Sequence, residues 1–141
     1  MNFNPGKAVL AGFIATIVLS LLMVMKTFMG MMPQLNVIKM LAQMLGTGPL
    51  GGWVAHFVIG SIAWGGGFAL LYPKLPGGAP WLKGVVFAIG AWVLMMLIIM
   101  PMAGAGLFAL HLGIMAPIAT LVLHIIFGAV MGGVYGEPAQ A

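Results

Sequence analysis

Four long stretches of this sequence are apolar and carry no charge, and no other feature constrains the fold as strongly. They span residues 8–25, 50–72, 84–102 and 112–135. A helix needs about 20 mostly apolar residues to cross the hydrocarbon core of a bilayer. The sequence therefore predicts an all-α integral membrane protein, a bundle of four transmembrane helices within a single membrane domain over residues 1–141.

The charge content supports this fold class. Charged residues make up 4% of the 141 residues and hydrophobic residues 63%, whereas about a quarter of a soluble domain is charged. So few charges cannot form a surface that faces water. The five basic residues are scattered lysines rather than a patch, so we expect membrane lipid and no nucleic acid as a partner.

The residue types present exclude several kinds of chemistry. The chain has no cysteine, and its one acidic residue is Glu137 near the end of the sequence. It therefore has no thiolate for catalysis or for zinc and no pair of carboxylates for acid–base catalysis. We expect a protein that is not an enzyme and that has no resident cofactor.

The first loop contains an amphipathic segment at about 33–45. The polar residues Asn36, Lys39 and Gln43 recur at intervals of three and four residues. Pro33 suits the first helical position, and Gly46 suits the end of the helix. A helix of this length is too short to span the membrane, so we expect it to lie in the interface. A soluble amphipathic helix packed on a partner is the alternative.

The third loop, at about 103–110, is apolar and uncharged. Such a segment is not typical of a freely solvated loop, and we expect it to pack against protein or to enter the headgroup region. Lysines give a bias in orientation: Lys7, Lys74 and Lys83 fall on one side of the predicted topology, and Lys26 and Lys39 on the other. The bias places both termini in the cytoplasm.

Small residues recur every four positions in three of the spans. They include Ala8, Gly12, Thr16 and Ser20; Gly52 and Gly60 around His56; and Ala116, Thr120, Gly128 and Gly132 around His124. Residues four apart share one helix face, and small residues let membrane helices approach closely. We therefore expect these faces, with both histidines on them, to point toward protein.

Sequence elements of the first half recur in the second. The first and third spans begin near Lys7 and Lys83, and His-x-x-x-Gly occurs at 56–60 and at 124–128. Both hairpins end near a tyrosine, Tyr72 or Tyr135. The pattern predicts an internal repeat of two helical hairpins, related by a pseudo-two-fold axis along the membrane normal.

His56 and His124 are the best candidate cofactor ligands, because two histidines on facing membrane helices can bind haem b or copper. Counting residues back from Tyr72 and Tyr135 places the two rings roughly 7–8 Å apart in height, and this difference argues against one haem bound by both. The alternative is a structural role, in which neutral imidazoles bond to Thr16, Ser20, Thr120 or a backbone carbonyl.

Methionine pairs at positions i and i+4 are candidate copper ligands. They are Met25 with Met29 and Met96 with Met100, and thioethers favour Cu(I). The alternative is that methionine serves here as a flexible apolar filler.

Several motifs together carry a family resemblance that covers nearly the whole chain. They are Met31-Met32-Pro33-Gln34-Leu35, Trp53-x-x-His56-Phe57-x-Ile59-Gly60, Tyr72-Pro73, Ala116-Pro117, Leu123-His124, Phe127-Gly128 and Tyr135. With these motifs the chain resembles an uncharacterised family of small bacterial four-span inner-membrane proteins, a domain of unknown function. The resemblance implies the location and the topology and assigns no catalytic residue.

These observations leave three functional hypotheses. The first is a non-catalytic accessory subunit that packs against a larger bacterial membrane complex, respiratory or redox, or that self-associates. The second is a carrier of haem b or copper that uses His56 and His124. The third is a transporter of small solutes.

Overall fold

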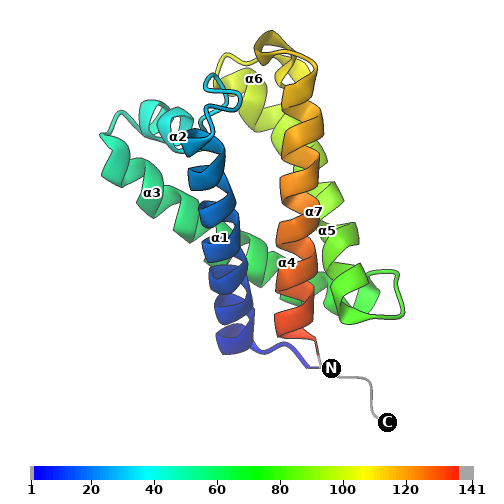
Figure 1. The fold of residues 1–141 in the computed structure, drawn as a ribbon. Coiled ribbons are helices and arrows are strands. Elements are labelled where there is room, and N and C mark those ends of the chain that lie inside the picture. Colours follow the sequence, from blue (N-terminus) through cyan, green and yellow to red (C-terminus); the bar gives the residue numbers. More distant parts are fainter. Residues whose placement is uncertain (1, 137–141) are drawn as a thin grey trace.

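The computed structural model describes residues 2–136, which form helices joined by short connections (Figure 1). Four helical segments are long and apolar enough to cross a membrane: Pro5–Phe28, Pro49–Lys74, Pro80–Met102 and Met115–Tyr135. The prediction of an all-α chain with four spans is confirmed, and each predicted boundary lies within four residues of the observed one.

Two spans are single α-helices, and the other two are interrupted. The first span is α1 (Pro5–Phe28) and the fourth is α7 (Met115–Tyr135). The second consists of α3 (Pro49–Val58), the π-helical η1 (Ile59–Trp64), α4 (Gly65–Leu71) and the 3-10 turn η2 (Tyr72–Lys74). The third consists of α5 (Pro80–Leu94), the π-helical η3 (Met95–Ile99) and α6 (Met100–Met102).

Proline and asparagine determine where several of these helices begin. A proline is the first residue of α1, α3 and α5, a position that needs no backbone N–H donor. Before α1, the Asn4 side chain accepts a hydrogen bond from the Lys7 amide at 3.0 Å, which satisfies one of the free donors at the helix start.

The helix of the first loop, α2 (Val37–Leu45), begins later than predicted. Pro33 does not start it. Instead Asn36 caps it, accepting a hydrogen bond from the Lys39 amide at 3.0 Å. Side-chain capping by Asn favours a helix start at the following residue, so the residues from Pro33 to Asn36 remain outside the helix. Gly46 ends the helix as predicted, in a left-handed conformation with φ 67°.

One face of α2 packs on α3. A Cβ atom at Gly52 would touch the Ile38 carbonyl oxygen and the Ala42 side chain, so glycine permits this close approach. The polar residues Asn36, Lys39 and Gln43 are exposed. The helix is thus amphipathic as expected and is packed on its own chain, while its location in the membrane interface remains a prediction.

Small residues form the seams between the spans, as the four-residue spacing predicts. Ala8, Gly12, Thr16 and Ser20 are all buried on α1. A Cβ at Gly12 would touch the Gly60 carbonyl oxygen, and one at Gly84 would touch the Gly128 carbonyl oxygen. The first contact joins α1 to η1, and the second joins α5 to α7.

The two hairpins differ in geometry. In the second, α5 and α7 pack against each other along their lengths. In the first, α1 packs on η1 and α4, while α3 diverges from the rest of the bundle toward α2 (Figure 1). Contacts between α1 and α7 join the two hairpins. The molecule is therefore tightly packed where α1, α4 and α7 meet and is more open around α3.

The third loop packs against protein, as predicted for an apolar, uncharged segment. It contains the 3-10 segment η4 (Leu107–Leu112). Ala105 and Ala109 are buried with Met96 and Met100, and the Phe108 ring lies 5.6 Å from the Trp92 ring between centroids. The loop thus closes one end of the helical pair formed by the third and fourth spans.

Candidate functional site

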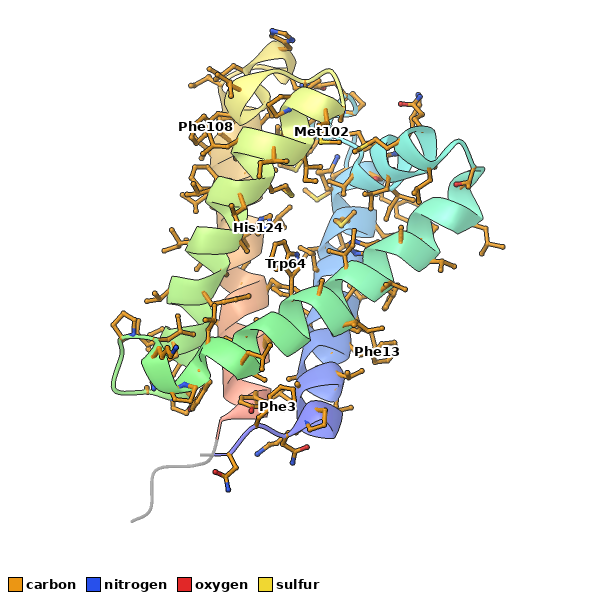
Figure 2. The ribbon with its side chains drawn as sticks, turned by 180° about the vertical axis from the view of Figure 1, so that it is seen from behind. Phe3, Phe13, Trp64, Met102, Phe108 and His124 are labelled. Carbon is orange, nitrogen blue, oxygen red and sulfur yellow. The ribbon has the colours of Figure 1, made fainter. Side chains whose placement is uncertain are left out.

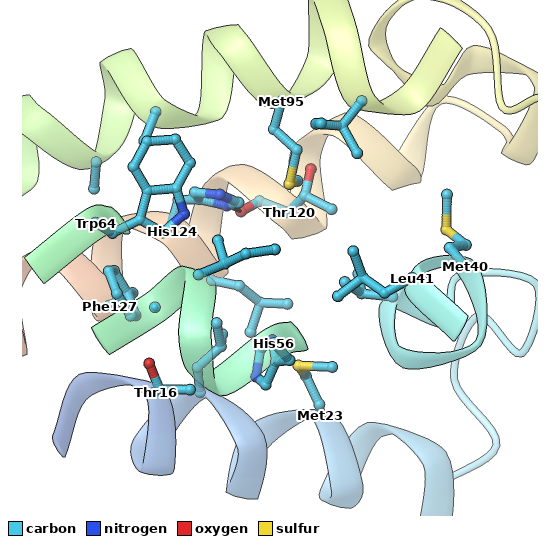
Figure 3. A pocket seen from close by; sticks show the side chains of 18 of the residues that line it. Thr16, Met23, Met40, Leu41, His56, Trp64, Met95, Thr120, His124 and Phe127 are labelled. Atoms are coloured by element: carbon cyan, nitrogen blue, oxygen red, sulfur yellow. Dashed lines mark hydrogen bonds between the residues drawn. The ribbon is translucent and has the colours of Figure 1, made fainter. Parts of the chain in front are cut away.

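A cavity of about 410 Å³ lies where the two halves of the bundle diverge. Its wall is formed by α1, α2, the second span, α5 with η3, and α7 (Figure 3). Nearly all the lining side chains are apolar. The charged or polar exceptions are Thr16, Lys26, His56, Thr120 and His124.

The cavity follows from the way the second and third spans run. Because α3 leans toward α2, it leaves the space beside η3 unfilled by a helix. Both π-helical segments contribute to the wall, η1 through Ile59, Gly60 and Trp64, and η3 through Met95 and Ile99. Single π-helical turns occur frequently at functional sites.

Apolar side chains form the exposed part of the cavity wall. Met44, Leu94 and Ile98 line the cavity and are 38%, 52% and 50% exposed. Leu94 and Ile98 belong to a span long and apolar enough to cross the membrane, where exposed side chains face hydrocarbon. The opening is therefore suited to molecules that arrive from the lipid rather than from water.

His56 enters the cavity from α3 and is only 8% exposed. Its Nε2 lies 3.2 Å from the Ser20 Oγ of α1. The aromatic rings of Trp53 and Phe57 meet it edge-on, with centroids at 5.9 and 5.8 Å. The ring is thus held by one hydrogen bond and two aromatic neighbours.

His124 enters from the opposite wall, on α7 (Figure 3). Its Nδ1 lies 2.8 Å from the Thr120 carbonyl oxygen. The Thr120 hydroxyl in turn accepts a hydrogen bond from Trp92 Nε1 at 3.0 Å. Both histidines face protein and are hydrogen-bonded to groups of the kind that the structural interpretation proposed, a serine hydroxyl and a backbone carbonyl.

Lys26 lies at the end of the cavity nearest the first loop. Its ammonium group donates to the carbonyl oxygens of Met31, Met32 and Leu35 at 3.2, 3.0 and 2.7 Å. An ammonium group has three protons, so these bonds use all of them. Lys26 therefore holds the turn before α2 in place.

The candidate methionines do not gather at one place. Met25 and Met29 are 56% and 68% exposed, whereas Met96 and Met100 are almost completely buried. Of the four, only Met100 lines the cavity. Within residues 2–136 there is also no cluster of three or more His, Cys, Asp or Glu side chains that could hold a metal ion.

The chain matches a protein-family model. The model described as a family of unknown function (DUF6789) matches residues 3–141. The chain belongs to this family. No curated protein and no solved structure matches it.

Membership in DUF6789 confirms the resemblance to an uncharacterised family and carries no functional residues with it. What the cavity of this DUF6789 chain can bind therefore follows only from the residues that line it. His56 and His124 both line this one cavity, from opposite walls (Figure 3).

The sequence analysis assigned most of the apolar cavity wall to no site, and Met40, Leu41 and Trp64 are examples. Met40 and Leu41 come from α2, which was expected only to lie in the interface. Trp64 comes from η1 and also packs on Phe87, with ring centroids 6.0 Å apart. Its spacing of eight residues from His56, about two helical turns, was the signal that both side chains share a face.

Proposed function

We propose that this protein is a non-catalytic membrane protein that binds an apolar small molecule within its helical bundle. The observation that carries the proposal is the cavity of about 410 Å³, lined almost entirely by apolar side chains from all four spans. Ligand sites in proteins are mostly apolar cavities of this size order with a few convergent polar groups.

The position of the cavity's opening supports a ligand that enters from the bilayer. The exposed rim residues Met44, Leu94 and Ile98 are apolar, so a molecule dissolved in the bilayer can enter without crossing a polar surface. Apolar cavities of this kind exclude water and accept apolar ligands.

Native mass spectrometry of the protein released from mild detergent tests the proposal directly. We expect wild-type protein to retain a bound apolar molecule. Ala91→Phe should reduce its occupancy at least tenfold, because Ala91 is buried on the cavity wall and a phenyl ring there occupies the ligand's space.

Ala63→Phe is the matched control. Ala63 lies on η1, is exposed, and does not line the cavity, so the same substitution adds the same ring outside the binding space. Equal occupancy in both variants, or no apolar molecule bound to the wild type, would refute the proposal.

An accessory role in a larger complex is the second candidate function. It is supported by Gly90 on α5 and Gly133 on α7, which are exposed and have no atom within 4 Å of a Cβ built on them. Exposed small residues let a helix of another subunit approach closely. We expect a partner that co-purifies with wild-type protein to be lost on Gly133→Leu, and to be retained on Leu70→Ile, which keeps an exposed site on α4 apolar.

Haem b or copper binding at His56 and His124, and transport of small solutes, remain sequence-based alternatives. Each histidine has one ring nitrogen without a hydrogen-bond partner among the described residues, so both can act as ligands to a metal. An absorption spectrum and elemental analysis of the purified protein distinguish a metal carrier from the binding of an apolar molecule. Uptake into vesicles tests for transport.

A further inference from the structure

The hydrogen-bond donors of the cavity wall are nearly all occupied. The Thr16 hydroxyl donates to the Gly12 carbonyl at 2.6 Å. The Thr120 hydroxyl donates to the Ala116 carbonyl at 2.8 Å, and the three protons of Lys26 go to the first loop. A ligand that needs a hydroxyl or ammonium donor finds none of these free.

The two hydrogen bonds of Ser20 favour one tautomer of His56, because the hydroxyl has a single proton to donate. The Ser20 hydroxyl donates its only proton to the Thr16 carbonyl at 2.7 Å. With its proton there, the hydroxyl oxygen accepts at its contact with His56 Nε2. In the neutral ring the proton is on Nε2, and Nδ1 carries a lone pair.

The same reasoning fixes the tautomer of His124. A carbonyl oxygen only accepts, so His124 Nδ1 donates to Thr120, and Nε2 carries the lone pair. Both rings are neutral in this arrangement, because a buried charge needs a partner of opposite charge. No Asp or Glu occurs within residues 2–136 to provide one.

Trp64 supplies a donor that is still free. Its Nε1 has no hydrogen bond within residues 2–136. In the described part of the chain, the one fully buried side-chain N or O atom without a partner is Ser61 Oγ. Trp64 Nε1 is therefore unpaired but not fully buried. The same holds for the unpaired ring nitrogens of His124 and His56. All three rings line the cavity, so these nitrogens are accessible from it. Trp64 and His124 lie beside each other in both views (Figures 2 and 3).

We propose that the ligand is an uncharged lipid-like alcohol whose hydroxyl lies between Trp64 and His124. Its oxygen accepts from Trp64 Nε1–H, and its proton is donated to His124 Nε2. This inference rests on the proposed function and adds the chemical class of the ligand.

Other polar head groups fit this arrangement less well. An ether, ester or ketone only accepts, so it would leave the lone pair of His124 unpaired. A carboxylate would bring a buried negative charge, and the ammonium group that lines the cavity, that of Lys26, has already used its three protons. Only a group that both donates and accepts satisfies Trp64 and His124 together.

Equilibrium binding of a matched pair of probes tests the inference. We would measure radiolabelled 1-tetradecanol and 1-methoxytetradecane on the full-length protein in phosphatidylcholine nanodiscs, with empty nanodiscs as background. We expect the wild type to bind the alcohol about tenfold more tightly than the ether, since a hydrogen bond in apolar surroundings contributes on the order of one factor of ten.

Three variants localise this preference. His124→Phe should bind both probes equally, because it removes the acceptor and keeps a ring. His124→Gln should retain part of the preference, because its amide oxygen is an acceptor at similar reach. His111→Phe is the control; His111 is exposed in the third loop, outside the cavity, and its variant should keep the tenfold preference.

The outcomes separate this inference from the proposed function. Saturable binding of both probes with equal affinity to the wild type, blocked by Ala91→Phe, would support the cavity as a ligand site and overturn the alcohol as its ligand. No saturable binding of either probe would overturn both. If His124→Phe fails to fold, Trp64→Phe tests the same hydroxyl from its donor side. Both probes can accept from Trp64 Nε1–H, so this variant should weaken the binding of both and keep the preference for the alcohol, and unchanged affinity for both probes would contradict the proposal.

Discussion

Single hydrogen bonds position the residues of the cavity wall. Ser20 bonds both to its own helix and to His56 of α3, so one hydroxyl joins two spans at the depth of the cavity. Ser61 is also buried, and its hydroxyl lacks a partner among the described residues. Ser20 therefore contributes a hydrogen bond between two spans, whereas Ser61 leaves a buried hydroxyl unpaired.

The serines give a prediction at the residue scale. Ser20→Ala leaves the Nε2–H of His56 without an acceptor, and we expect it to lower the free energy of unfolding by about 1–3 kcal/mol. Ser61→Ala removes an unpaired hydroxyl and should leave stability unchanged or raise it. Thermal unfolding in detergent, followed by circular dichroism, measures both. Equal losses in the two variants would show that the bond from Ser20 to His56 contributes nothing.

At the scale of elements, backbone approach at glycines holds the helices together. Lipid provides no hydrophobic force between helices, so the contact of Gly84 with the Gly128 carbonyl brings α5 and α7 close enough to pack. Neither residue has a side chain that could clash. The cavity exists because the same close packing is absent between α3 and α5.

Glycine substitutions test this description of the seam. Gly84→Ala places a methyl group against backbone atoms of α7, and we expect a loss of about 1–3 kcal/mol in the free energy of unfolding. Gly90→Ala meets open space on the same helix, and it should raise helix stability by about 0.5–1 kcal/mol. Chemical denaturation in mixed micelles compares them. A stable Gly84→Ala protein would contradict close packing at this seam.

The cap of α2 gives a second prediction for an element. Asn36→Ala removes the side chain that accepts from the Lys39 amide, and the expected cost is about 1 kcal/mol. Amide hydrogen exchange should become faster in α2 while α7 stays protected. Asn4→Ala is the matched control, since it removes the same kind of cap from α1 and should leave exchange in α2 unchanged.

For the whole molecule, ligand binding and stability are linked. A ligand that binds only the folded state at 100 times its Kd stabilises that state by about 2.7 kcal/mol. We therefore expect 1-tetradecanol to raise the Tm of the wild type and to leave that of Ala91→Phe unchanged. A rise of equal size in both proteins would mean that the alcohol acts through the surrounding lipid.

The absence of native cysteine makes the membrane topology testable. Single cysteines at Lys74 and Gln43 fall on opposite sides of the four-span arrangement. With the termini in the cytoplasm, an impermeant maleimide added to intact cells should label Gln43→Cys and leave Lys74→Cys unlabelled until the cells are broken. The reverse pattern would place the termini outside.

The sequence by itself determined the four spans, the cap at Gly46 and the small-residue seams. These features depend on local composition and on a spacing of four residues, which are visible along one chain. It also indicated that His56 and His124 face protein, because both lie among small residues on one helix face.

Only the tertiary structure decided that α2 closes a cavity, that Met25 and Met29 lie apart from Met96 and Met100, and that Trp64 lies beside His124. Each of these depends on the direction that a span takes beyond the small-residue contacts with its neighbour. That direction is set where α3 turns toward α2 and where π-helical turns rotate the residues that follow. Periodicity along the chain places residues on a face, but the angle between two helices follows from contacts between segments far apart in sequence.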